Sequence, residues 1–162
     1  WLNGEHIRRL DPQKFHELAL KYYPEGVRHL DLEKISRLIQ IRIERFTEIP
    51  TMVKFLYELP DYDPALFENP KSKSTLQSSR EILQEVIPLL EGMQEWTNES
   101  LFTALKDFAS AHGYKIGTVM WPIRTALSGQ FASPGGATEL ADLLGKKETL
   151  RRLKIGLAKL QP

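Results

Sequence analysis

The segment Thr75-Leu-Gln-Ser-Ser-Arg-Glu-Ile-Leu-Gln-Glu-Val-Ile-Pro-Leu-Leu90 shows which kind of secondary structure this chain uses. Thr75 is a residue type that caps helix N-termini. Apolar residues follow it at the three- and four-residue spacing of one helix face, which predicts a helix over 75–90 with a buried side. The residues expected to be buried are Leu76, Ile82, Leu83, Val86, Ile87 and Leu90.

The sequence after this segment predicts more helices of the same kind. Thr97 is placed to cap a helix that Gly113 ends, because glycine readily adopts the left-handed conformation that follows a helix. The remaining expected helices are short and closely spaced, and Gly129 and Gly145 lie where the first two of them end. They are expected over 118–128, 135–144 and 147–160.

The sequence before residue 60 predicts three further helices. Asp11-Pro12 is a cap followed by proline at the first helical position, and Asp31 caps a second helix. Apolar residues then recur at helical spacing through about Phe46, so this helix is expected to be long. A third, short helix is expected over 49–59.

The stretch Pro60-Asp-Tyr-Asp-Pro64 separates two helical regions. Its two prolines remove backbone donors and restrict the residues before them, so no helix continues through it. We therefore predict a hinge here and two packed helical subdomains, 1–59 and 60–162. No segment shows sustained alternation of apolar and polar residues between hairpin turns, which argues against a sheet. The prediction is an all-α fold of short helices.

The composition is that of a folded, soluble protein with room for one domain or two small subdomains. Of the 162 residues, 41% are hydrophobic and 27% are charged. The absence of cysteine excludes a disulfide framework, a thiolate zinc site and a cysteine nucleophile. No apolar run approaches the roughly 18 to 20 residues that span a bilayer, and no signal-peptide pattern is present. We expect a cytoplasmic protein with no membrane partner, and the start on Trp1 leads us to expect a fragment of a larger protein.

The net charge of +1 hides an uneven distribution along the chain. Residues 81–105 hold five acids and no lysine or arginine, whereas residues 106–162 hold nine bases against four acids. Such an asymmetry is expected when one face meets a polyanion, although basic residues solvated on a final helix give the same pattern.

No constellation of residues indicates catalysis or metal binding. The four histidines stand far apart without the spacing of metal ligands, and no glycine-rich phosphate loop follows a strand. No carboxylate pair stands out as a general acid and base, and the serines lack the context of a nucleophile. We therefore predict no catalytic residue and no metal site, and we expect a binding module rather than an enzyme.

One stretch interleaves aromatic, proline and basic residues: Met120-Trp-Pro-Ile-Arg-Thr-Ala-Leu-Ser-Gly-Gln-Phe-Ala-Ser-Pro134. Single-stranded RNA is recognised by stacking its bases on flat side chains and by hydrogen bonds to their edges, often from arginine. Trp121 and Arg124, about one helical turn apart, provide both elements. The alternative is a tryptophan packed in the core beside an arginine that points to solvent.

The motifs in the last third of the chain follow one another in a known order. The chain reads Pro-Ile-Arg-Thr-Ala-Leu-Ser-Gly over 122–129, Ser-Pro over 133–134 and Leu-Leu-Gly-Lys-Lys-Glu-Thr-Leu-Arg-Arg-Leu over 143–153. This order resembles PLRxALTG, SP and LLGKExxLxRL in the C-terminal anticodon-binding region of bacterial glutamyl-tRNA synthetases. The start of the chain resembles the W-x-N-x-x-Y-I stretch of that family, with His6 where tyrosine is usual. Residues 42–46 and 96–97 also fit, so the resemblance covers essentially the whole chain.

The resemblance implies the helical anticodon-binding region of a class I aminoacyl-tRNA synthetase. The parent enzyme activates glutamate with ATP and Mg²⁺ and transfers it to its tRNA. The two ATP-binding signatures of that enzyme, HIGH and KMSKS, are missing from this chain. Lys71-Ser-Lys-Ser74 is similar to KMSKS, but it follows the hinge. We interpret the stretch 69–74, in which it lies, as an exposed loop. We expect no cofactor in this part, no aminoacylation by it alone, and a catalytic domain of the same polypeptide as a partner. The other expected partner is the anticodon loop of glutamate tRNA, bound by a monomer.

The resemblance also assigns RNA-contacting residues. Arg45 matches an arginine of the family that contacts the third anticodon base. In the family this arginine accompanies preference for glutamate tRNA over glutamine tRNA. The alternative role for Arg45 is that of a cation paired with the C-terminal dipole of a helix. Arg124 matches the arginine that contacts the first anticodon base, and Lys106 matches a basic residue expected to contact phosphate. Trp121 is also placed at the RNA, and its role is open between hydrogen bonding, stacking and packing. The other residues expected to contact anticodon bases, through their backbone or by packing, are Pro122, Ser133 and Pro134.

A helical protein-interaction module is the competing interpretation. In it, the basic end of the chain docks on an acidic protein partner. A bound partner that anticodon stem-loop RNA fails to displace would favour this interpretation.

Overall fold

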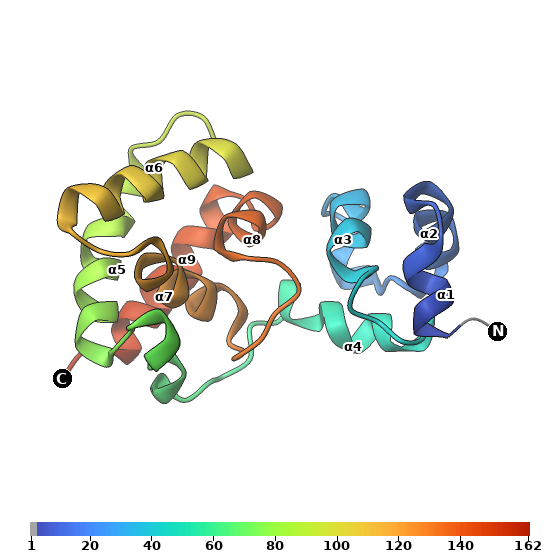
Figure 1. Ribbon diagram of the computed structural model, residues 1–162, viewed down its shortest axis with the longest axis horizontal. Helices are drawn as coiled ribbons and strands as arrows, with labels where there is room; N and C mark the ends of the chain where they lie inside the picture. Colours follow the sequence, from blue (N-terminus) through green and yellow to red (C-terminus); the bar gives the residue numbers. More distant parts are fainter. Residues whose placement is uncertain (1–2) are drawn as a thin grey trace. The chain divides into compact units, whose positions relative to one another are not determined.

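The computed structural model describes residues 3–162, and over this range the chain forms α-helices and short 3-10 helices without a β-strand (Figure 1). This observation confirms the predicted all-α fold. The chain divides into two compact units, of which the first ends at Leu59 and the second spans Pro60–Pro162. Trp1 and Leu2, which open the motif resembling W-x-N-x-x-Y-I, lie outside the described residues.

Two helices of the first unit begin at the predicted caps Asp11 and Asp31. The Asp11 carboxylate accepts hydrogen bonds from the backbone N–H groups of Gln13 and Lys14, at 3.1 and 3.4 Å. Asp31 accepts one from the N–H of Lys34 at 3.2 Å. The elements are α1 (Gly4–Arg9), α2 (Pro12–Ala19), η1 (Leu20–Tyr22), η2 (Glu25–Val27), α3 (Leu32–Ile39), η3 (Phe46–Glu48), α4 (Ile49–Val53) and η4 (Lys54–Leu56).

Apolar side chains from these short elements form the core of the first unit. Helices α2 and α3 pack against each other, with Phe15 and Ile35 turned inward. Because each helix is only a few turns long, its stability comes from this shared burial rather than from its own backbone hydrogen bonds. The fully or almost fully buried residues include Ile7, Phe15, Val27, Ile35, Ile39, Ile43, Ile49 and Val53.

Helix α3 is shorter than predicted, because it ends at Ile39 and does not continue toward Phe46. Glu48 keeps the helix from continuing through residues 44–45: its carboxylate accepts hydrogen bonds from the N–H groups of Glu44 and Arg45, at 2.9 and 3.0 Å. These donors are satisfied by a side chain instead of by carbonyl groups four residues earlier. Ile43 is fully buried although it lies in a turn, so its helical spacing reflects a core contact and not a helix.

The second unit contains the longer helices, and two of them begin at the predicted caps Thr75 and Thr97. Leu76, predicted to be buried, is instead exposed beside the first of these caps. The hydroxyls of Thr75 and Thr97 accept hydrogen bonds from the N–H groups of Ser78 and Ser100, both at 3.0 Å. The elements are η5 (Pro64–Phe67), η6 (Pro70–Ser72), α5 (Leu76–Glu91), α6 (Asn98–His112), α7 (Ile116–Ser128), α8 (Ala137–Leu144) and α9 (Lys146–Lys159).

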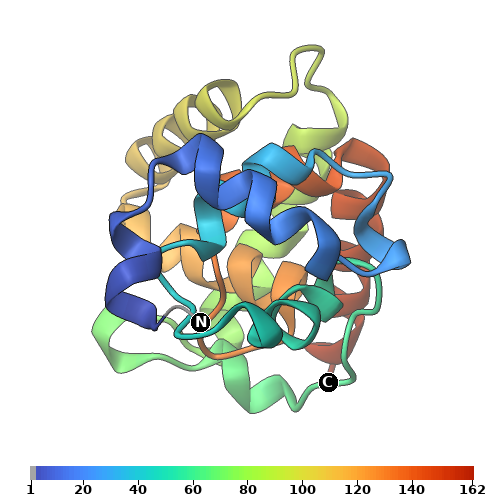
Figure 2. The same ribbon diagram turned by 90° about the vertical axis from the view of Figure 1, so that its right-hand side faces the viewer.

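Helix α7 forms the centre of the second unit. It contacts α5, α6, α8 and α9 (Figure 1, Figure 2). Most of its residues are buried. Gly129 ends this helix in the left-handed conformation, with φ of 63°. A Cβ atom at this position would lie 2.8 Å from Cγ of Pro60, so only glycine fits without a rearrangement. The chain therefore turns sharply from α7 into the loop 129–136.

The stretch 69–74 is more ordered than the exposed loop that was predicted. It contains η6, and Asn69 and Ser74 are buried and exchange two backbone hydrogen bonds, each of 3.0 Å. The Ser74 hydroxyl also donates to the carbonyl of Phe67 at 2.8 Å. Lys71 and Lys73 are exposed, as expected. The polar composition misled the prediction because these serine and asparagine side chains satisfy the backbone locally.

A buried arginine connects α9 to the C-terminal end of α7. Arg152 is fully buried, and its guanidinium donates to the carbonyl of Leu127 and to the carboxylate of Glu148, both at 2.7 Å. The Leu127 carbonyl belongs to the last turn of α7, where intrahelical donors run out. Arg152 therefore stabilises the helix end from which the loop 129–136 departs.

Candidate nucleic-acid interface

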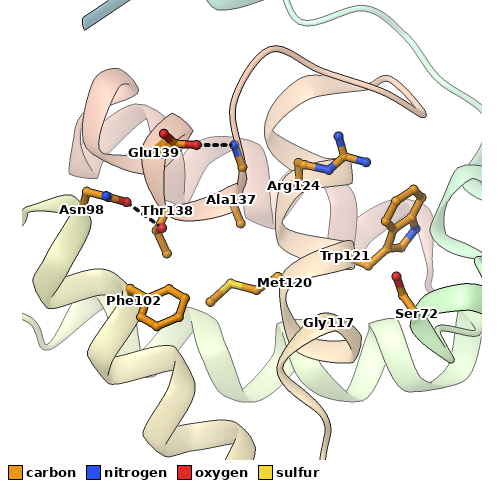
Figure 3. A pocket seen from close by; sticks show the side chains of 11 residues that line it. Ser72, Asn98, Phe102, Gly117, Met120, Trp121, Arg124, Ala137, Thr138 and Glu139 are labelled. Atoms are coloured by element: carbon orange, nitrogen blue, oxygen red, sulfur yellow. Dashed lines mark hydrogen bonds between the residues drawn. The ribbon is translucent and has the colours of Figure 1, made fainter. Parts of the chain in front are cut away.

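Arg124 links α7 to the loop that follows it. Its guanidinium donates to the carbonyl of Phe131 at 2.7 Å and to the hydroxyl of Ser133 at 3.1 Å. The guanidinium carbon lies 4.8 Å from the centre of the Trp121 ring, so the cation rests on an aromatic face (Figure 3). Arg124 is half-buried and held from several sides. The structure thus places three of the predicted residues, Trp121, Arg124 and Ser133, in one cluster.

Trp121 packs inside the second unit. The residue is only 9% exposed, and its indole N–H donates to the carbonyl of Leu66 at 2.9 Å. Of the three roles left open by the sequence, packing and hydrogen bonding are therefore seen within the chain itself. The predicted alternative of a core tryptophan is correct for Trp121. It does not describe Arg124, which lies over the indole and bonds to the loop instead of simply pointing to solvent.

Ser133 and Pro134 shape the loop next to Arg124. The Ser133 hydroxyl accepts from Arg124 and donates to the carbonyl of Gly135 at 3.1 Å. Pro134 is buried, and so is Pro122 within α7. The two prolines therefore fix backbone geometry around the cluster, and neither presents its ring to solvent.

A groove of about 440 Å³ opens beside this cluster, between α6, α7 and the start of α8. Phe102 of α6 is 46% exposed at the groove and lies close to Met120 (Figure 3). The Thr138 hydroxyl donates to the side-chain carbonyl of Asn98 at 2.7 Å, which joins α8 to α6. The lining residues are Ser72, Asn98, Phe102, Gly117, Met120, Trp121, Arg124, Gly136, Ala137, Thr138 and Glu139.

Sequence reasoning missed Phe102, because its position on the helix does not separate it from the buried residues. The buried face of α6 is formed by Leu101, Leu105, Phe108 and Ala109. Phe102 lies about 100° around the helix from Leu101 but only about 20° from Ala109, so it stands at the edge of that face. Tertiary packing, and not its position on the helix, leaves it 46% exposed.

Lys106 lies on the same side of α6 as Phe102. The two residues are four positions apart, which places their side chains next to each other on a helix surface. Lys106 is exposed. Lys106 is not among the residues that line the groove.

Arg45 belongs to the first unit, whereas the other six predicted residues belong to the second. It is exposed and immediately precedes the 3-10 helix η3, and its backbone N–H donates to Glu48. The predicted alternative, in which Arg45 pairs with the C-terminal dipole of a helix, is wrong. Helix α3 ends at Ile39, so Arg45 stands at the N-terminal end of the next element, where the dipole disfavours a cation.

Most of the basic residues near the C-terminus pair within the chain. Glu148 accepts two hydrogen bonds from Arg151, at 2.9 and 2.7 Å, and one from Arg152. The bonds from Arg151, joined by Arg152, lower the pKa of Glu148 to about 2. The other pairs join Lys154 to Glu91 at 3.2 Å, Lys159 to Asp61 at 2.7 Å and Lys146 to the carbonyl of Met93 at 2.7 Å. Most of these basic groups therefore have a carboxylate or carbonyl partner within the unit.

The described residues hold neither a grouping of three or more potential metal ligands nor a helix with the length and apolar character to cross a membrane. His112 contacts the carboxylate of Glu85 and the carbonyl of Phe108, and His16 contacts Ser36. These histidines have partners that connect helices. The cluster around Arg124 offers hydrogen-bond donors, a positive charge and aromatic surface.

Comparisons with known proteins agree with this kind of chemistry. The glutamate–tRNA ligase from Clostridium acetobutylicum is 44% identical to the chain over 164 aligned residues. The one from Clostridium botulinum is 46% identical over 162 residues. Each alignment covers 99% of this chain. The chain spans only 34% and 33% of these relatives, about a third of their length.

A solved structure shares the fold over nearly the whole chain. A glutamate tRNA ligase from Elizabethkingia meningosepticum, crystallised with its amino acid, matches with a TM-score of 0.78 at 21% identity, covering 98% of this chain and 31% of that one. Residues 14–157 match the family described as "Anticodon binding domain". That match covers most of the sequence, and the chain belongs to the anticodon binding domain family.

Proposed function

We propose that this chain binds the anticodon loop of glutamate tRNA as part of a glutamate–tRNA ligase. The observation that carries the proposal is the cluster in which Arg124 is held between the Trp121 ring and the loop 129–136, beside an open groove. The identity to clostridial glutamate–tRNA ligases over 99% of the chain supports the choice of tRNA.

In this proposal the two units read different nucleotides of one loop. Arg124 reads the first anticodon base and Arg45 the third, since a guanidinium offers planar N–H donors to the acceptor atoms of a base edge. Ser133, Pro134 and Pro122 set the backbone around the first base, and Trp121 holds Arg124. Lys106 contacts phosphate and adds affinity without sequence preference. Arg45 gives preference for glutamate tRNA over glutamine tRNA.

Catalysis belongs to another part of the same polypeptide. That domain uses ATP and Mg²⁺ to activate glutamate, and the anticodon-binding part sets which tRNA is presented to it. We propose a monomeric enzyme of the cytoplasm.

Binding of a synthetic stem-loop tests the proposal. The 162-residue chain should bind the glutamate anticodon stem-loop more tightly than a stem-loop with an exchanged anticodon, by about tenfold or more at moderate ionic strength. Affinity for both should fall steeply with salt, because phosphate contacts release counterions. Equal affinity for the two stem-loops, measured by fluorescence anisotropy, would exclude specific recognition.

A further inference from the structure

We propose that Phe131 is a base-stacking residue: one unpaired nucleobase of the bound RNA lies against the open face of its ring, next to Arg124. This inference rests on the proposed function and adds a binding residue that neither the sequence motifs nor the family match assigns. It applies to the second unit alone.

Phe131 is exposed in a way that its surroundings do not explain. The residue is 61% exposed, although it follows a helix that is buried almost throughout. Its ring meets Trp121 in an edge-to-face arrangement, with centroids 5.3 Å apart and planes at 67°. Trp121 therefore supports one side of the ring, while the larger part of the residue faces water. An aromatic ring held in this way presents apolar surface that a flat partner can cover.

The loop that carries Phe131 is fixed in place. The Phe131 carbonyl accepts a 2.7 Å hydrogen bond from Arg124, and the Ser128 hydroxyl accepts one from the N–H of Gln130 at 3.2 Å. Gly129 turns the chain at the start of the loop, and Ser133 bonds to Gly135 at its end. The ring is therefore ordered before any ligand arrives, which lowers the entropy cost of stacking.

The neighbouring charge favours a nucleobase as the flat partner. A base stacked on Phe131 brings its edge and its phosphate near the Arg124 guanidinium, which is positively charged at all relevant pH values. The carboxylate in the adjoining groove, that of Glu139, already accepts a 2.9 Å hydrogen bond from the N–H of Gly136 at the start of α8. Stacking plus a cation is the combination that single-stranded nucleic acids use.

Two substitutions at Phe131 separate stacking from folding. Phe131→Leu removes the aromatic face, and Phe131→Tyr keeps it. Both retain the hydrogen bond to Arg124, because that bond uses the main-chain carbonyl. We expect Phe131→Leu to weaken binding of the glutamate anticodon stem-loop roughly tenfold, and Phe131→Tyr to stay within about twofold of the original chain.

Stem-loops that lack single bases identify the stacked nucleotide. Each unpaired nucleotide is replaced in turn by an abasic one, and the affinity ratio between the original chain and Phe131→Leu is measured for every RNA. The affinity ratio should fall to near one when the abasic site replaces the nucleotide that stacks on Phe131, because that stacking is then already lost. It should stay near ten for abasic sites at the other positions. A ratio near one with the complete stem-loop, or a loss that is the same for every abasic RNA, would overturn the assignment.

The same experiment distinguishes this inference from the proposed function. If the original chain does not bind the stem-loop, the proposed function fails. If it binds, and Arg124→Ala weakens binding while Phe131→Leu does not, only the stacking assignment fails. Unchanged thermal unfolding of Phe131→Leu serves as the folding control, because the side chain is largely exposed.

Discussion

At the scale of single residues, the arrangement of Trp121 and Arg124 makes a recognition role compatible with a buried tryptophan. The indole is largely buried, but it supplies the surface on which the guanidinium rests. The loop carbonyl of Phe131 and the hydroxyl of Ser133 then fix the direction of that group. Trp121 is therefore a positioning residue, and a guanidinium held in one plane discriminates better between base edges than a mobile one.

Substitution of Trp121 tests this positioning role. Trp121→Phe and Trp121→Leu both lose the hydrogen bond to Leu66, so they carry the same unpaired carbonyl. Only the phenylalanine keeps an aromatic face under Arg124. We expect Trp121→Leu to reduce discrimination at the first anticodon base about three- to tenfold, and Trp121→Phe to retain most of it. Equal discrimination ratios for the two variants, measured by stem-loop binding, would show that the indole acts through packing alone.

At the scale of elements, local signals predicted helix starts and ends better than helix lengths. Thr75, Thr97 and Gly113 act as the sequence indicates, because caps involve residues within one turn of each other. The end of α3 was not predictable from periodicity, since Ile43 is buried by tertiary contacts in a turn. Phe102 and Phe131 face the site through the packing of α6 and the path of loop 129–136, which no local pattern fixes.

Two helix-ending glycines form a matched pair for measuring the tightness of the turn before loop 129–136. Gly113 and Gly129 both have positive φ, of 73° and 63°. A Cβ at Gly113 meets nothing within 4 Å, whereas one at Gly129 approaches Pro60 at 2.8 Å. Gly113→Ala should cost about 1 kcal/mol of stability from the backbone conformation alone. Gly129→Ala should lower the free energy of unfolding by at least about 1 kcal/mol more than Gly113→Ala does. Equal losses for the two variants, measured by urea unfolding, would contradict the close approach of Gly129 to Pro60.

The ion pairs of Glu148 with Arg151 and Arg152 within α9 should make stability depend on pH. Folding lowers the pKa of Glu148 from 4.5 to about 2, chiefly through the hydrogen bond from Arg151. The folded state therefore binds the proton less readily, and the resulting stabilisation is complete above about pH 4.5 and is lost as the pH falls toward 2. The free energy of unfolding of Glu148→Gln, measured from pH 6 down to about pH 2, should decline less than that of the original chain. Parallel declines would show that Glu148 does not contribute.

At the scale of the whole molecule, the sequence motifs and the structure contribute different parts of the functional argument. The motif order allowed the family to be recognised, and the match over residues 14–157 confirms it. Arg124 and Ser133, nine positions apart, lie within hydrogen-bonding distance, as a shared site requires. Arg45 was assigned by resemblance alone, and it lies in the other compact unit. The central claim is that the two units read different bases of one RNA loop.

The most direct test of this claim measures position-specific discrimination by two arginine variants. Stem-loops that differ from the glutamate anticodon only at the first or only at the third base are bound to the original chain, Arg124→Ala and Arg45→Ala. We predict that Arg124→Ala loses about tenfold discrimination at the first base and keeps it at the third, and that Arg45→Ala does the reverse. If both variants weaken every stem-loop by the same factor, the arginines contact only the phosphate backbone and the claim is wrong.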